Sequence, residues 1–237
     1  PCMSLDGSTI ASIADGLLNA ERTGIPIDQP SVRHPGMDAR DAYAVQERIV
    51  DARLAAGERI VGWKVGLTSR AMQQMLGVDQ PDYAAVLSDW LLGDGSTIAA
   101  GHLIAPRVEA EIGFILARPL RGPGVTVADV LAATGSVTAC IEVIDSRVRD
   151  WKIALPDTIA DMASCARVIV GPDRVDPDGM DLRLVGAVVE RNDEVASTGA
   201  GAAVLGHPAA GVAWAANTLG PMGIDRKSTR LNSSHRT

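Results

Sequence analysis

The hydrophobic periodicity of the chain changes once along its length, and this change restricts the possible folds more than any other feature. Apolar residues recur at helical spacing over residues 8–22 and again over 37–56, so each segment predicts a helix with one buried face. Gly24 and Gly57 follow these segments, as glycines commonly do where helices end. We therefore expect a helical N-terminal part that covers residues 1–57.

Beyond residue 57 the hydrophobic pattern is that of short strands. Strand-like runs, separated by Gly, Pro and Asp, cover residues 59–66, 108–116, 138–144, 167–170 and 182–191. Two other segments, 127–134 and 208–219, have a helical pattern. Helices followed by a mainly antiparallel or mixed sheet indicate an α+β fold rather than a doubly wound α/β fold. We expect residues 58–224 to form one main domain.

The composition argues against several classes of function. The 237 residues carry a formal net charge of −7, and the 22 Lys and Arg residues are scattered singly, which gives no basic surface for nucleic acid. No glycine-rich phosphate-binding motif is present, and no window approaches the ~20 apolar residues that a membrane span needs. The three cysteines include no Cys-x-x-Cys pair, so we expect a cytoplasmic protein without a disulfide framework or a zinc site.

The segment 225–237 breaks sharply from the composition upstream of it. It reads DRKSTRLNSSHRT, contains a single aliphatic residue and has little apolar surface to bury. The string is similar to translated sequencing-adapter sequence, so we expect a polar tail that is not native to the protein. The alternative is an ordinary flexible C-terminus.

Two glutamates alternate with apolar residues in the segment 106–116. Apolar residues occupy the even positions and share one face of the expected strand, so Glu109 and Glu111 share the other face. Side chains two positions apart on a strand lie roughly 6 to 7 Å apart, which is near enough to bind one cation together. The alternative is a strand whose solvent-exposed face carries both glutamates.

Glu142 stands in a run that is apolar on both faces, which indicates that its side chain is buried. Buried glutamates are rare unless they are paired or bind a cation. If Glu109, Glu111 and Glu142 converge, their all-oxygen donor set suits Mg²⁺ or Mn²⁺ better than zinc. The alternative is an ion pair of Glu142 with Arg147 or Arg107.

Lys64 lies in the middle of the strand expected at 59–66 and precedes a turn. A partly buried lysine at such a position binds a carboxylate or transfers protons, because burial lowers its pKa. The alternative is a surface lysine on an edge strand. The segment 77–82 has the composition of a turn, in which Asp79 or Asp82 is either a turn-former or an acid–base group.

These residues lie in blocks that resemble the 2-keto-4-pentenoate hydratase group of the fumarylacetoacetate hydrolase superfamily. The blocks are GWKVGLTS (62–69), GVDQPDYAAVL (77–87), PRVEAEIGFIL (106–116), IEVIDSRVRDW (141–151), DTIADMASCARVIVG (157–171) and GHPAAGVAWAANTLG (206–220). Their number and order make the resemblance specific, and it covers nearly all of residues 11–224. One position departs from the family pattern, since Met162 stands where an asparagine is expected.

The resemblance implies the superfamily's mixed β-roll, homo-oligomers and a metal-dependent active site. In that site Glu109, Glu111 and Glu142 hold Mg²⁺ or Mn²⁺, and Lys64 and Asp79 bind substrate or transfer protons. The further residues that the resemblance places in the substrate pocket are Leu67, Gln80, Arg147, Asp161 and Ser164. It also implies closing strands after the last helix; because the segment 225–237 stands in their place, we expect an open sheet edge and poor folding or inactivity.

The activity that the resemblance implies is hydration of 2-hydroxypenta-2,4-dienoate (2-keto-4-pentenoate) or a close analogue to a 4-hydroxy-2-oxo acid, in meta-cleavage catabolism of aromatic compounds. The first alternative is decarboxylation of 2-oxo-3-hexenedioate (4-oxalocrotonate) by a sister enzyme with the same glutamates; the block at 77–87 favours the hydratase. An alternative of another class is a non-catalytic or inactive subunit. We expect a small-molecule dienoate substrate, a homo-oligomer and an association with a related decarboxylase or aldolase of the pathway, and we expect neither a nucleic acid nor a membrane as a partner.

Overall fold

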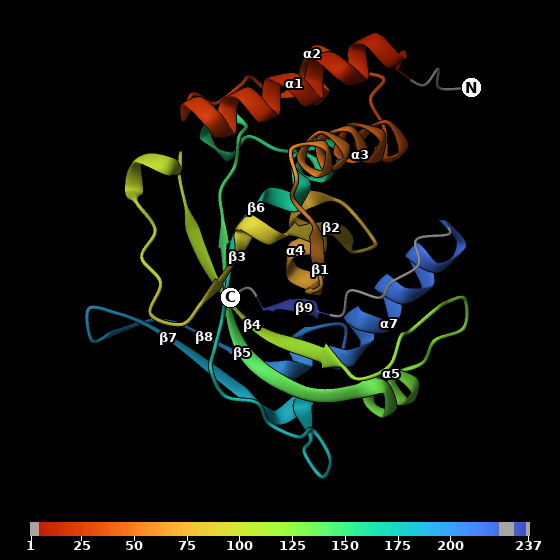
Figure 1. Ribbon diagram of the computed structural model, residues 1–237, viewed down its shortest axis with the longest axis vertical. Helices are drawn as coiled ribbons and strands as arrows, with labels where there is room; N and C mark the ends of the chain where they lie inside the picture. Colours follow the sequence, from red (N-terminus) through yellow and green to blue (C-terminus); the bar gives the residue numbers. More distant parts are fainter. Residues whose placement is uncertain (1–4, 223–229, 236–237) are drawn as a thin grey trace.

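The computed structural model describes residues 5–222 and 230–235. Three helices, α1 (Gly7–Thr23), α2 (Pro30–Arg33) and α3 (Ala39–Ala55), form a layer at one end of a curved sheet (Figure 1). The two long helices match the segments predicted from the periodicity. Their apolar stripes, which include Leu17 and Val45, are buried because α1 packs on α3 and α3 packs on the sheet domain.

Local signals fix the ends of this helical layer. Asp6 accepts hydrogen bonds from two backbone N–H groups in the first turn of α1, at 2.9 and 2.8 Å. Asp38 and Asp41 form a capping box at the start of α3. Gly24 ends α1 with a φ of 70°, a left-handed conformation that costs glycine little.

Seven strands form one mixed sheet in the order β2-β1-β9-β4-β5-β6-β3. Their bounds are β1 Ile60–Gly66, β2 Asp82–Leu87, β3 Leu91–Gly93, β4 Arg107–Leu116, β5 Thr134–Ile144, β6 Cys165–Val170 and β9 Arg230–His235. Neighbouring strands are antiparallel, except that β9 is parallel to β1 and β3 is parallel to β6. The predicted α+β class is confirmed.

A two-stranded antiparallel ribbon of β7 (Gly186–Arg191) and β8 (Glu194–Ala200) completes the β structure of the described residues. The strand predicted at 182–191 begins later than expected, because Leu182–Leu184 form a 3₁₀ helix, η5. The other 3₁₀ helices of the described residues are η1 Ser88–Trp90, η2 Ala100–His102, η3 Arg149–Trp151, η4 Met162–Ser164, η6 Gly201–Ala203 and η7 Gly220–Met222.

Four α-helices accompany the sheet. They are α4 Arg70–Leu76, α5 Val127–Ala133, α6 Leu155–Ala160 and α7 Pro208–Leu219. α7, which matches the predicted segment 208–219, is apolar over most of its surface and packs against α5, β1 and β9. Because a helix of this kind is stable only when it is enclosed, α7 forms part of the core of the sheet domain (Figure 1).

The polar segment near the C-terminus was expected to be a tail, but part of it forms a strand. Its residues Arg230–His235 form β9, which pairs with β1 on one side and with β4 on the other. The physical reason is that strand pairing joins backbone groups, so a polar segment serves as a partner for two strand edges. The sheet edge that was expected to be open is therefore covered at 230–235. The rest of the segment, 225–229 and 236–237, lies outside the described residues.

The strand directions bring several chain segments to one end of the sheet. β1 and β5 end there, and β2, β4 and β6 begin there, because β1 is antiparallel to β2 and β5 is antiparallel to both β4 and β6. The connections at 67–69, 145–153 and 161–164 therefore leave or enter the sheet at this end. This convergence positions the site described below.

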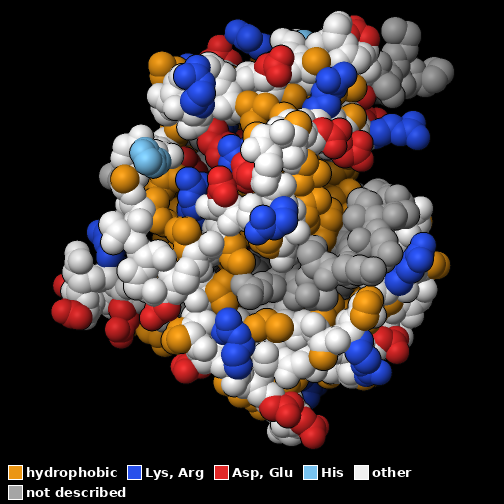
Figure 2. Space-filling view, in the orientation of Figure 1, with side chains coloured by type: hydrophobic (Ala, Val, Ile, Leu, Met, Phe, Trp, Pro, Cys, Tyr) orange, Lys and Arg blue, Asp and Glu red, His pale blue; other side chains and the backbone are white. Residues whose placement is uncertain are grey.

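The surface agrees with the charge pattern of the sequence. On the face shown in Figure 2, acidic and basic side chains are interspersed, and no continuous basic area is visible. Across the part of the chain that the structure describes, no helix combines the length and the apolarity needed to cross a membrane.

Candidate metal centre and adjoining cavity

Three glutamates meet on one face of the strand pair β4–β5. Glu109 and Glu142 are direct cross-strand partners, and Glu111 follows two positions later on β4. Each offers a carboxylate oxygen, and these three oxygens lie within 4.8 Å of one another. All three side chains are buried, with exposed fractions of 8% for Glu109, 5% for Glu111 and 1% for Glu142. The structure thus brings together the three carboxylates that the sequence pattern singled out.

Lys64 lies against this cluster from β1. Its Nζ is 3.0 Å from Oε1 of Glu142 and donates a hydrogen bond to the carbonyl oxygen of Ala163 at 2.8 Å. Burial opposes the charged form, but the carboxylates of Glu142 and Asp82 outweigh it and raise the pKa of Lys64 above its ordinary value. The expected lowering of this pKa is therefore wrong, and the side chain is a buried ammonium group.

Asp82, the first residue of β2, is a fourth buried carboxylate of the site. It pairs across the sheet with Gly66, and a Cβ atom at Gly66 would lie 2.3 Å from Oδ1 of Asp82 and 3.4 Å from Nζ of Lys64. Glycine at this position thus leaves room for the aspartate beside the lysine. Burial and the neighbouring Glu109 raise the pKa of Asp82, although Lys64 acts in the opposite direction. Among the described residues, Oδ1 of Asp82 has no hydrogen-bond partner.

The structure does not bring Asp79 or Gln80 to this site. Both are exposed in the bend that precedes β2, whereas Asp82 is buried. The turn composition of 77–82 did not distinguish Asp79 from Asp82 as the acid–base group, and the family resemblance favoured Asp79. Asp82 differs from Asp79 because it belongs to β2, in which all six residues are buried. The apolar run after Asp82 is the sequence pattern that indicates this burial.

A strained turn at Met162–Ser164 lies next to Lys64 of β1. Met162, Ala163 and Ser164 have φ values of 55°, 49° and 55°, so three consecutive non-glycine residues adopt the left-handed conformation. This conformation presents the Ala163 carbonyl to Lys64. Within the described chain, the buried hydroxyl of Ser164 has no hydrogen-bond partner. Such strain is typical of functional sites, where the surrounding structure holds it in place.

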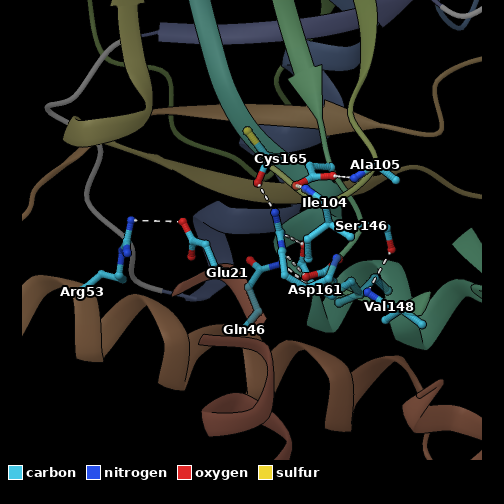
Figure 3. A network of polar contacts seen from close by, with 12 residues as sticks. Glu21, Gln46, Arg53, Ile104, Ala105, Ser146, Val148, Asp161 and Cys165 are labelled. Atoms are coloured by element: carbon cyan, nitrogen blue, oxygen red, sulfur yellow. Dashed lines mark hydrogen bonds and ion pairs between the residues drawn. The ribbon is translucent and has the colours of Figure 1, made fainter. Parts of the chain in front are cut away.

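A buried ion pair supports this turn from behind. Nε of Arg147 donates to Oδ1 of Asp161 at 2.5 Å, and the same guanidinium donates to the carbonyl oxygens of Asp161 and Cys165 at 2.6 and 2.9 Å. Figure 3 shows Asp161 between Gln46 and Glu21 on the helical side and Cys165 on the sheet side. Burial raises the pKa of Asp161 to about 6, although Arg147 acts in the opposite direction. Arg147 and Asp161 thus hold the pocket wall rather than line the cavity.

A small cavity of about 50 Å³ opens beside Lys64 and the turn at Ala163 and Ser164. Of the residues that the resemblance placed in the pocket, Leu67 and Ser164 line it. Its polar lining also includes Lys64, Asp82 and Glu109. The residues that complete the described lining are Gly66, Thr68, Ser69, Met72, Ile144, Trp151, Ile153, Thr158 and Ala163.

The carboxylate cluster fits a divalent cation. Four buried carboxylates, those of Glu109, Glu111, Glu142 and Asp82, accompany a single ammonium group, Lys64, so the described site has an excess of negative charge. Burying unbalanced charge is costly unless a counterion offsets it. Oxygen ligands of one Mg²⁺ or Mn²⁺ ion lie about 3 to 4 Å apart, which is compatible with the spacing of the three glutamate oxygens.

The chain is similar in sequence to characterised enzymes of two activities. No family model matches the chain. A 2-hydroxypent-2,4-dienoate hydratase of Pseudomonas putida is 46% identical over 221 residues, which are 93% of this chain and 100% of that protein. A 4-oxalocrotonate decarboxylase of Pseudomonas sp. (strain CF600) is 41% identical over 220 residues, which are 93% of this chain and 83% of that protein.

The chain is also similar to solved structures. A 4-oxalocrotonate decarboxylase from Pseudomonas putida G7, complexed with magnesium and adipate, has a TM-score of 0.93 and 38% identity; the match covers 98% of this chain and 89% of that one. A fumarylpyruvate hydrolase from Pseudomonas aeruginosa has a TM-score of 0.54 and 12% identity over 73% of this chain and 76% of that one, so it shares the fold alone.

Proposed function

This chain belongs to the 2-keto-4-pentenoate hydratase group of the fumarylacetoacetate hydrolase superfamily, and from that premise we propose that it is a metal-dependent hydro-lyase. It adds water to 2-hydroxypenta-2,4-dienoate or a close analogue and forms a 4-hydroxy-2-oxo acid. The observation that carries this proposal is the buried cluster of Glu109, Glu111 and Glu142, which adjoins a cavity lined by Glu109, Lys64 and Asp82.

The cofactor that we propose is Mg²⁺ or Mn²⁺, held by Glu109, Glu111 and Glu142. The donor set supports this choice, because hard divalent cations prefer carboxylate oxygens and the described site offers neither histidine nor thiolate ligands. When bound, the cation supplies Lewis acidity toward the carboxylate and the 2-oxygen of the substrate.

The chain's own residues position the substrate and move its protons. The buried ammonium of Lys64 offers a positive charge and a hydrogen-bond donor to the developing negative charge on the 2-oxygen. Loss of the 2-hydroxyl proton and protonation at C5 give the conjugated 2-oxo-3-enoate; water oxygen then adds at C4 and a proton at C3. We assign the proton transfer at carbon to Asp82, because it lines the cavity beside Lys64 and its burial raises the pKa of its carboxyl group.

The test is a Mg²⁺- or Mn²⁺-dependent assay that follows loss of 2-hydroxypenta-2,4-dienoate by absorbance. Glu109→Gln should abolish metal-dependent turnover. Asp82→Asn and Asp79→Asn are a matched pair, because the two aspartates lie three positions apart but only Asp82 is buried in the site. We expect a fall in kcat of about 10² to 10⁴-fold for the Asp82 variant and a smaller one for Asp79. The reverse order would assign the role to Asp79, and unchanged turnover in Glu109→Gln would overturn the metal centre.

Decarboxylation of 4-oxalocrotonate is the second candidate function. It is favoured by the similarity to the decarboxylases of known sequence and structure. The higher identity to a hydratase over the whole length of that protein favours the first candidate. Supplying both substrates and measuring CO₂ release against water addition separates the two activities. A non-catalytic subunit would do neither and would not bind Mg²⁺.

We also propose that the protein is cytoplasmic and forms a homo-oligomer, in which a second copy covers an apolar groove. The groove lies between the outer face of β4–β5 and the ribbon strand β7. It is lined by residues such as Ile141, Met180 and Val188, whose exposed fractions of 46%, 42% and 60% are high for apolar side chains. Size-exclusion chromatography with light scattering tests the assembly, and Val188→Asp should dissociate it. Adding a related decarboxylase or aldolase to the same column tests the expected association.

A further inference from the structure

Trp151 lies at the edge of the cavity and is held in place from two sides. Its indole Nε1 donates a hydrogen bond to the carbonyl oxygen of Ala105 at 2.9 Å. The guanidinium carbon of Arg107 lies 4.3 Å from the centroid of the ring, in a cation–π contact. The ring is partly buried and lines the cavity, whereas Arg107 is exposed and is not among the lining residues.

The strand register places this pair at a defined distance from the glutamates. Glu109 faces Glu142 across β4 and β5, and Arg107 faces Ile144 one pair further along the same face. Two residues along a strand span about 7 Å, so Ile144 and Arg107 lie about that far from the carboxylate cluster. Because Arg107 and Ile144 mark the strand ends farthest from Glu111, we call the part of the cavity wall formed by Ile144 and Trp151 its distal end.

The backbone at Trp151 is strained. Asp150 and Trp151 have φ values of 58° and 54°, and a bulky residue rarely adopts this left-handed conformation. Leu67, Ala163 and Ser164, which line the same cavity, share this property. Four of the nine non-glycine residues with positive φ in the described chain thus line one cavity, and Trp151 has the largest side chain among them.

The distal end is apolar and lacks a cation for a second carboxylate. Ile144, Trp151 and Ile153 contribute apolar surface there, and Leu67 and Met72 contribute more from the β1 side. Among the described lining residues the one basic side chain is Lys64, which is already paired with Glu142. A carboxylate buried at the distal end would have no unpaired cation beside it among the described lining residues, and burying an unpaired charge is costly.

We infer that Trp151 determines substrate specificity, as the wall that limits the length and the charge of the substrate tail. This inference rests on the proposed function and names its substrate class: 2-hydroxydienoates of five or six carbons with an uncharged tail, in preference to longer acids that end in a second carboxylate. Arg107 is a positioning residue, because it acts through the ring that it stacks on.

The experiment compares the five-carbon dienoate, the six-carbon dienoate and the seven-carbon dioic analogue as substrates. Wild type, Trp151→Ala, Trp151→Phe and Arg107→Gln are tested, with Lys152→Ala as the control, because Lys152 is the exposed neighbour of Trp151. We expect Trp151→Ala to raise kcat/KM for the longest substrate relative to the shortest by about tenfold or more, since pocket size contributes discrimination of this order. Trp151→Phe should lie between, and Lys152→Ala should match wild type.

A second measurement does not depend on turnover. Calorimetric titration with saturated 2-oxo acids of five and seven carbons, in the presence of Mg²⁺, should show the same change in relative affinity in Trp151→Ala. An unchanged ratio in both measurements would overturn the inference while leaving the hydratase intact. A selective loss of the dioic substrate in Arg107→Gln would also overturn it, because Arg107 would then bind a second carboxylate. Wild type that neither turns over nor binds any of these acids would overturn the proposed function itself.

Discussion

Glu109 of β4 and Glu142 of β5 face each other directly across an antiparallel strand pair, and both carboxylates are buried. Like charges in this arrangement destabilise a sheet. A chain selected for stability alone would place apolar residues at both positions. The pair therefore indicates a site at which binding of a cation offsets the repulsion, and the predictions below follow from this conflict between stability and function.

Replacing Glu109 by Gln should stabilise the metal-free protein and abolish its response to metal. Removing one of two opposed charges should raise the free energy of unfolding by about 1 kcal/mol. Because Glu109 is one of the three proposed ligands, we expect Mg²⁺ to raise the melting temperature of wild type but not that of the variant. Denaturant unfolding with and without Mg²⁺ measures both effects, with Glu194→Gln, an exposed glutamate of β8, as the control. A variant that is less stable without metal and still responds to Mg²⁺ would contradict this view.

Replacing Lys64 by Met should destabilise the protein, and Mg²⁺ should recover part of the loss. Glu142 and Asp82 would lose their buried counterion, which costs about 3 to 5 kcal/mol for a broken buried pair. Lys152→Met is the matched control, because Lys152 forms only an exposed ion pair with Asp150. Chemical denaturation at several Mg²⁺ concentrations checks the prediction. Equal stability of the Lys64 and Lys152 variants would show that the ammonium does not offset the carboxylates.

Replacing Gly66 by Ala should reduce both the activity and the stability of the protein. The added Cβ would lie 2.3 Å from Oδ1 of Asp82, so the carboxylate must shift from its present position. We expect about a 100-fold loss in kcat/KM, the order of an acid–base contribution, and a stability loss of about 1 to 3 kcal/mol from overpacking. Gly93→Ala is the control, since a Cβ at that strand position contacts nothing within 4 Å. Wild-type kinetics in Gly66→Ala would mean that Asp82 need not stay where the structure places it.

The ion pair of Arg147 and Asp161 gives a prediction about pH. Burial raises the pKa of Asp161 from its ordinary value of 3.8 to about 6, so the folded protein holds this proton more tightly than the unfolded chain does. This contribution favours folding below about pH 4 and declines as the pH rises to about 6. The stability of wild type relative to Asp161→Asn should therefore fall, by at most about 3 kcal/mol, between about pH 4 and about pH 7. Urea unfolding at both pH values tests the sign, and a rise in this difference would contradict it.

The sequence alone determined the local structure and the chemical character of the site. Periodicity located α1, α3 and α7 because each helix buries one stripe or one whole surface, and this pattern is visible without knowledge of its partner. Alternation put Glu109 and Glu111 on one strand face, and an apolar run marked Glu142 as buried. Residue types then indicated a cation with oxygen ligands.

Only the tertiary structure decided which residues share the cavity. The choice between Asp82 and Asp79 depends on where β2 begins beside β1, and the pairing of Lys64 with Glu142 depends on β1 and β5 lying in one sheet. The strand at 230–235 arises because backbone groups of β1 and β4 accept a partner of any polarity, so its composition could not predict it. Contacts between residues far apart in the chain are set by strand order and register, and a single sequence carries no periodic signal for either.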